Sequence, residues 1–324
     1  MYNDGITLQA AEWLPFIQRK DAVMKKKLLN VLKVVVLVAT VYFIVVNLKM
    51  RPMDIVDYLL QAKSFFYLAL SIFVVFLAVQ AWIWVQILND SGKQISSYRG
   101  LVIYMTSQFA KYLPGGFWNL VGRVYLTSKH GVVLGTQMTA ILYENMMLGI
   151  VSVIYGIILL YSFHFIFLPV LLAVAVLLPI AYFFYEPVRV FSQKMIHKLS
   201  KRFRGMELSL PRERFFLYLS YYFLSHLLQG IAFWLLLQTF GVESVNIVTA
   251  AGIFAVSWLI GLISPLPGGI GIREGALVFL LSFQVPVPVA TQISIITRIW
   301  NLMGELVLFT LLNSIDLIRK RMAA

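Results

Sequence analysis

Long apolar runs separated by short polar or basic segments set the pattern of this chain. They cover residues 28–48, 65–88, 136–161, 165–185, 215–240 and 290–312. Each run reaches or approaches the roughly 20 residues that a helix needs to cross about 30 Å of hydrocarbon. A transmembrane barrel would instead show shorter segments of alternating polarity. The pattern therefore predicts an all-α, polytopic membrane protein with about six full transmembrane helices.

Two pairs of shorter apolar segments lie between these runs. The first pair, 101–112 and 117–126, flanks the sequence Leu113-Pro114-Gly115-Gly116. The second pair, 248–263 and 273–283, flanks Leu266-Pro267-Gly268-Gly269. Proline ends the first arm of each pair and glycine permits a tight reversal. An arm of about 12 residues rises only about 18 Å, so we expect two re-entrant hairpins with tips near the bilayer midplane.

Charge fixes the expected orientation. Only 13% of the residues are charged, and the net charge of +13 comes from clusters beside the apolar runs, at 19–27, 189–214 and 319–321. Basic clusters in such places are typical of cytoplasmic segments that contact anionic head groups, and not of nucleic-acid binding. Both termini and the 186–214 loop are therefore predicted to be cytoplasmic, in a multi-pass protein of the cytoplasmic (inner) cell membrane.

With this orientation the two hairpins open to opposite faces, which is typical of an inverted-topology repeat. The expected division is a cytoplasmic N-terminal segment (1–27), a first membrane repeat (28–161), a second repeat that includes the basic 186–214 loop (162–313), and a basic cytoplasmic tail (314–324). The first run is too long for the apolar region of a signal peptide, so we expect it to be retained as a span.

Ionisable and polar residues within the membrane-depth segments are the candidate site. Burying a charge at this depth is costly, so such residues are rare and usually functional. Free N–H groups at the start of each second arm would also favour an anion such as phosphate. The predicted substrate-binding residues are Lys111, Pro114, Gly115, Gly116, Arg123, Glu144, Pro267, Gly268, Gly269, Arg273, Glu274, Arg298, Asn301 and Glu305.

Purely structural interpretations exist for the same residues. Each Pro-Gly-Gly sequence could simply kink packed helices, and the charges could form structural ion pairs, for example Arg123 with Glu144 or Arg273 with Glu305. His226 and Gln229 are expected to form an interhelical hydrogen bond. The chain has no cysteine, its four histidines show no metal-ligand spacing, and no catalytic motif occurs. We therefore expect neither a cofactor nor a metal, and no enzymatic activity.

Two segments, 111–123 (KYLPGGFWNLVGR) and 264–275 (SPLPGGIGIREG), resemble the two signatures of the lysylphosphatidylglycerol synthase transmembrane (flippase-like) family. In the multiple peptide resistance factor of that family, this membrane region flips an aminoacylated phospholipid that a fused soluble domain synthesises. The present sequence contains no such synthase domain. The resemblance therefore implies a flippase for an anionic or aminoacylated phospholipid, or for a polyprenyl-linked lipid, and a homodimer by family analogy.

Two other functions fit the same pattern. One is a transporter of a small soluble anion that uses the same repeat. The other is a membrane enzyme, or its accessory protein, in lipid or glycolipid modification. A lateral opening towards lipid would favour the flippase, whereas converging His, Asp or Ser side chains would favour the enzyme.

Overall fold

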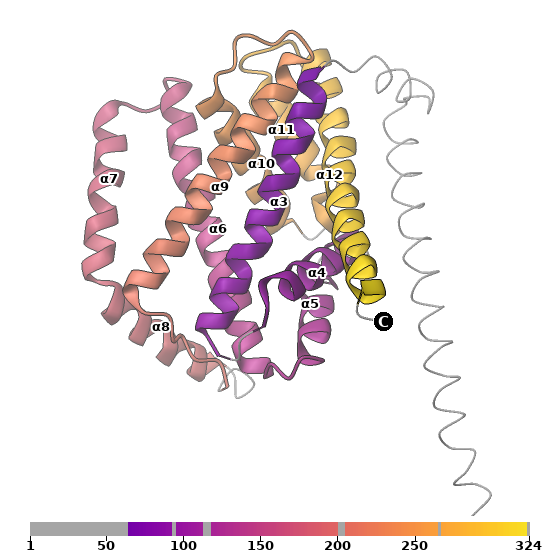
Figure 1. Cartoon of the computed structure of the whole chain (residues 1–324). Helices are drawn as coiled ribbons and strands as arrows, with labels where there is room; N and C mark the ends of the chain where they lie inside the picture. The colour runs from indigo at the N-terminus through magenta and orange to yellow at the C-terminus, as the bar shows by residue number, and fades with distance from the viewer. Residues whose placement is uncertain (1–63, 93–94, 113–117, 200–204, 265–266, 323–324) are drawn as a thin grey trace, which may run out of the picture. The chain divides into compact units, whose positions relative to one another are not determined.

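The computed structural model describes residues 64–92, 95–112, 118–199, 205–264 and 267–322. All of them belong to the compact unit formed by residues 56–324. The predicted first span at 28–48 and the tip residues Pro114, Gly115 and Gly116 lie outside the described residues. Within the described part of the chain the regular structure consists of helices (Figure 1).

Among the described residues, four helices are long and apolar enough to cross a membrane, and a bent pair of shorter helices would make a fifth span if it counts as one. The four long helices are α3 (Ser64–Asp90), α6 (Leu134–Ser162), α9 (Arg212–Gln238) and α12 (Val287–Met322). The helices α3 and α9 pack against each other along much of their length, and the shorter α10 (Ile247–Ile263) packs against α6 and α9. The predicted class, an all-α multi-pass membrane protein, is confirmed.

Each predicted hairpin region contains two short helices and a 3₁₀ turn. The first comprises α4 (Ser97–Gln108), η1 (Phe109–Tyr112) and α5 (Trp118–Ser128). The second comprises α10, η3 (Pro267–Gly269) and α11 (Ile272–Leu281). Figure 1 places α4 and α5 towards one end of the bundle and α11 towards the other. The turns η1 and η3 contact each other in the interior.

The order of elements is the same in both halves. A long helix, a short helix, a 3₁₀ turn, a short helix and a second long helix follow one another in α3–α6 and again in α9–α12. Asn246 caps α10 by accepting a hydrogen bond from the Thr249 amide at 2.9 Å. Ser96 caps α4 in the same way through the Arg99 amide at 3.4 Å. The orientation of the two halves relative to the membrane faces stays a prediction.

The first hairpin is attached to the last long helix. The Tyr98 hydroxyl of α4 donates to the Leu312 carbonyl of α12 at 2.5 Å. The Phe109 ring of η1 meets the Phe309 ring edge to face, with centroids 5.0 Å apart. Elements from opposite halves of the chain therefore share one packing surface.

The region around the predicted fourth span differs from the expectation. The 165–185 run forms α7 (Leu168–Phe183), which is followed after a bend of 73° by α8 (Tyr185–Leu199). The predicted 186–214 loop thus begins as a helix. Pro187 has no N–H to continue the hydrogen bonding of α7 but is compatible with the first turn of a new helix. None of the residues of α7 is buried, so this helix stands at the edge of the bundle.

Candidate functional site

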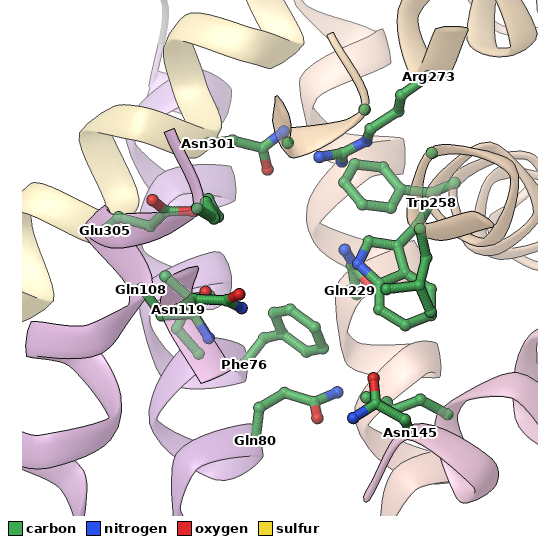
Figure 2. A pocket seen from close by; sticks show the side chains of 18 of the residues that line it. Phe76, Gln80, Gln108, Asn119, Asn145, Gln229, Trp258, Arg273, Asn301 and Glu305 are labelled. Atoms are coloured by element: carbon green, nitrogen blue, oxygen red, sulfur yellow. The ribbon is translucent and has the colours of Figure 1, made fainter. Parts of the chain in front are cut away.

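A cavity of about 220 Å³ lies where the two hairpins meet. Its lining comes from α3, α4, η1, α5, α6, α9, α10, η3, α11 and α12, so nearly every described element contributes. In Figure 2, Gln108, Asn119 and Glu305 lie on one side of this space, and Gln229, Trp258 and Arg273 lie on the other. Its acidic and basic side chains, other than His226, are Lys111, Arg123, Glu144, Arg273, Arg298 and Glu305.

The tip of the second hairpin reaches the cavity because it is made of glycine. Gly268 and Gly269 have φ angles of 58° and 66°, in the left-handed region that favours glycine. A Cβ on Gly269 would lie 2.8 Å from the backbone of Gly261 on α10, so no side chain fits there. Arg298 donates from Nη1 to the Gly268 carbonyl at 3.3 Å, which connects α12 to the tip.

A buried ion pair joins the two helices that follow the first tip. Arg123 of α5 and Glu144 of α6 approach to 2.5 Å, and their side chains are only 2% and 4% exposed. The Tyr104 hydroxyl donates to the other Glu144 oxygen at 2.9 Å. The Arg123 guanidinium also lies 4.0 Å from the centre of the Tyr104 ring and 5.0 Å from that of Trp84. The predicted pairing of Arg123 with Glu144 is confirmed.

The second half has a corresponding pair with the charges exchanged. Glu274 of α11 lies 3.3 Å from Arg298 of α12. The other Glu274 oxygen accepts a hydrogen bond from the Gly271 amide at 2.6 Å, which caps the start of α11. In both halves, therefore, the helix after the tip is linked to the next long helix by an ion pair.

A third ion pair connects the two halves. Lys111 of η1 binds Glu305 of α12, a pairing that was not expected from the sequence. Arg273 places its guanidinium 4.9 Å from the centre of the Phe254 ring. A pairing of Arg273 with Glu305 stays a prediction. Among the described lining residues four side chains are cationic and two are carboxylates. With Glu274, which pairs with Arg298 from outside the lining, the site keeps an excess of one positive charge.

Most of the predicted site residues meet in this cavity. Lys111, Arg123, Glu144, Gly268, Gly269, Arg273, Arg298, Asn301 and Glu305 line it. Glu274 does not line it but pairs with Arg298, and Pro267 begins η3. Pro114, Gly115 and Gly116 lie outside the described residues. Whether these residues bind a substrate stays a prediction.

Several lining residues were missed from the sequence. They are mostly uncharged polar or aromatic: Phe76, Gln80, Gln108, Asn119, Asn145, Gln229 and Trp258 (Figure 2). The amide residue Gln80 lies within the apolar run 65–88, and Asn145 directly follows Glu144. A polar residue inside a transmembrane run was a usable signal, because such residues usually face the interior.

The predicted interhelical hydrogen bond of His226 is wrong. Its Nδ1 lies 2.9 Å from the Tyr222 carbonyl, four residues earlier in α9. An interhelical bond forms one residue earlier instead, where Gln80 of α3 donates to the Ser225 hydroxyl at 3.0 Å. His226 and Gln229 both line the cavity.

Fold and site together define a multi-pass helical membrane protein with a charged interior cavity between two short-helix hairpins. The chain matches the family described as "Lysylphosphatidylglycerol synthase TM region" over residues 30–308. Because the match covers most of its length, the chain belongs to this family. A comparison with curated proteins gives no match.

Proposed function

We propose that this protein is a lipid flippase that moves an anionic or aminoacylated phospholipid, or a polyprenyl-phosphate-linked lipid, between the leaflets of the cytoplasmic membrane. The polar head group would pass through the charged cavity while the hydrocarbon chains stay in lipid. The observation that carries the proposal is the gathering of four cations and two carboxylates around one interior space at the meeting point of η1 and η3.

The size of the cavity supports a head group as the cargo. Its volume of about 220 Å³ is below the roughly 300–1,000 Å³ of pockets that enclose drug-sized ligands. A whole phospholipid is larger than such a ligand, so only its polar end fits. This restriction suits a flippase, whose task is to shield the head group from hydrocarbon.

The cationic side chains that line the cavity support a head group that carries an anion such as phosphate. Arg273 and Arg298 contribute donors from the second half of the chain, and Lys111 and Arg123 contribute them from the first. Arginine offers planar, paired donors that match phosphate oxygens. Glu144 and Glu305 would balance this charge, or bind a cationic group such as a lysyl ester.

In this mechanism the cavity need not be open to both leaflets at the same time. Repacking of the two halves around the cavity would alternate access, as in other transporters built from repeats. The membrane potential could bias direction, since it supplies about 2.3 kcal/mol per charge for every 100 mV.

The test is transbilayer movement in liposomes. Purified protein is reconstituted with fluorescent phosphatidylglycerol, and the fraction in the outer leaflet is read by adding a membrane-impermeant reductant that quenches it. Arg123→Ala, Arg273→Ala and Glu305→Gln should each slow the movement by roughly tenfold to hundredfold, because a hydrogen bond to a charged group contributes about 1.5–3 kcal/mol.

Two matched changes serve as controls. Arg212→Ala and Glu213→Gln alter an exposed pair at the start of α9, outside the cavity lining, and should leave the rate unchanged. Size-exclusion profiles in detergent establish that each variant is folded. Wild-type rates in all three cavity variants would remove the cavity from the transport path. Transport of inorganic phosphate without lipid movement would favour the soluble-anion carrier.

A further inference from the structure

An apolar groove of about 520 Å³ runs between α6 and α7. On α7 it is formed by Val174, Leu177, Leu178 and Ala181, which recur at the spacing of one helical face. The facing surface of α6 includes Gly149 and Ile157. A Cβ built on Gly149 would meet nothing within 4 Å, so the absence of a side chain there leaves room in the groove.

The groove and the charged cavity meet at Asn145. This residue lines both spaces, and the remaining lining residues of the groove are apolar. Its Nδ2 donates to the Ile141 carbonyl of the same helix at 2.8 Å. In Figure 2, Asn145 lies beside Gln80 at one end of the cavity. The polar cavity and the apolar groove thus border the same side chain.

We propose that this groove holds an acyl chain of the lipid whose head group occupies the charged cavity. The inference rests on the proposed flippase function and narrows its cargo to an amphiphile with an anionic head group and a flexible hydrocarbon chain. A soluble anion would use the cavity but would have no use for the groove. A chain that emerges at Asn145 would meet hydrocarbon directly, because α7 has no buried residue and only 33% of the apolar stretch of α6 is buried.

The length of the groove matches one leaflet. From Asn145 to Ile157, α6 rises by about 18 Å. Half of the hydrocarbon thickness of a bilayer is about 15 Å. A lipid with its head group in the cavity and its acyl chain along this stretch of α6 would therefore be halfway across the membrane. Its chain would lie in the half of the bilayer towards Ser162.

The test uses the absence of cysteine from the chain, which allows a single fluorophore to be attached by one introduced cysteine. Leu178→Cys places the label in the groove, and Leu172→Cys places it on the same helix outside the groove lining. Each labelled protein is reconstituted in phosphatidylcholine vesicles with a few per cent of a lipid that carries a nitroxide quencher in mid-chain. The quencher lipid is either phosphatidylglycerol or a diacylglycerol with the same chains.

At position 178, phosphatidylglycerol should quench at least twofold more than diacylglycerol, because the head group in the cavity retains the chain in the groove. At position 172 the two lipids should quench equally, since both act there as bulk lipid. The excess at 178 should disappear in Arg273→Ala, which alters the cavity alone, and in Gly149→Leu, which fills the groove alone.

Equal quenching by both lipids at position 178 would overturn the proposal. So would a disulfide cross-link from the Leu178→Cys variant to a second cysteine introduced in the 28–48 segment, or between two copies of that variant, because another protein segment would then occupy the groove. The excess at 178 without any transbilayer movement would leave the groove assignment standing and refute the flippase function. Transbilayer movement without the excess quenching at 178 would refute the groove assignment and leave the flippase function standing.

Discussion

Replacing Arg123 by methionine tests whether the buried pair with Glu144 is chiefly structural or chiefly a substrate site. The change leaves the Glu144 carboxylate, whose side chain is 4% exposed, with the Tyr104 hydroxyl but without its cation. Removing one partner of a buried ion pair typically costs about 3–5 kcal/mol. We therefore expect the free energy of unfolding to fall by about that amount, a factor of roughly 10² to 10³ or more in the unfolding equilibrium.

The double variant Arg123→Met/Glu144→Leu removes both charges and keeps similar volumes. Replacing a buried pair by apolar side chains is often neutral or stabilising. The lost stacking of Arg123 on Tyr104 and Trp84, about 0.5–2 kcal/mol, is partly replaced by contacts between the methionine sulfur and these rings. Glu144→Leu also leaves the buried Tyr104 hydroxyl without its acceptor, which costs about 1–3 kcal/mol. The double variant should thus be more stable than the single variant but lie about 1–3 kcal/mol below the wild type.

The assay combines equilibrium unfolding in mixed micelles, followed by tryptophan fluorescence, with the liposome transport measurement. The single variant should be unstable and inactive, and the double variant should be more stable than the single variant and still inactive. A loss below about 1 kcal/mol in the single variant would contradict the view that the pair is desolvated. Full transport by the double variant would show that the two charges hold helices together and do not act on the lipid.

Four further outcomes are expected. Gly269→Ala should lower the free energy of unfolding by at least about 1–2 kcal/mol, because its φ is 66° and the added Cβ meets the α10 backbone at 2.8 Å. Gly149→Ala lies within a helix with open space around it and should raise the free energy of unfolding by about 0.5–1 kcal/mol. A Gly149→Ala variant less stable than the Gly269→Ala variant would contradict the backbone argument for both positions. Exchanging the ion pair by Lys111→Glu with Glu305→Lys should retain stability, whereas either change alone should cost roughly 3–5 kcal/mol in thermal or denaturant unfolding. A cysteine at the exposed Lys194 of α8 should react with an impermeant maleimide in inverted membrane vesicles but not in right-side-out vesicles, and the reverse result would invert the topology.

The hydropathy pattern was sufficient to predict the long helices and the arms of the hairpins. The predicted runs 65–88, 136–161 and 215–240 correspond to α3, α6 and α9 with shifts of a few residues at their ends. The break between α7 and α8 was missed, because the apolar run continues through Phe184 and hides the change of direction. The signal lay in Pro187, whose missing N–H disfavours a continuous helix, although α7 accommodates Pro179 in its interior.

The charged residues of the site were identifiable from the sequence, but of the three ion pairs described above only that of Arg123 with Glu144 was. Arg123 and Glu144 belong to neighbouring elements, α5 and α6, so local connectivity favours their pairing. Lys111 and Glu305 are far apart in sequence, and their contact depends on how η1 from the first half packs against α12 from the second. No pattern within either segment encodes that packing. The amides of Gln80 and Asn145 carry no formal charge, so they stand out less from the surrounding apolar residues than the buried acids and bases do.

The attachment of the first hairpin to α12 limits how the protein can move. Tyr98, Phe109 and Lys111 contact α12 at Leu312, Phe309 and Glu305, so the contacts extend over about two helical turns. A hydrogen bond, a ring contact and an ion pair would all have to break before these elements could separate. Both elements also pack against α3, where the Trp300 ring lies 4.3 Å from that of Phe73. The α4–η1 arm, α3 and the last long helix should therefore move together, and the boundary of the moving parts would not coincide with the boundary between the two halves of the sequence.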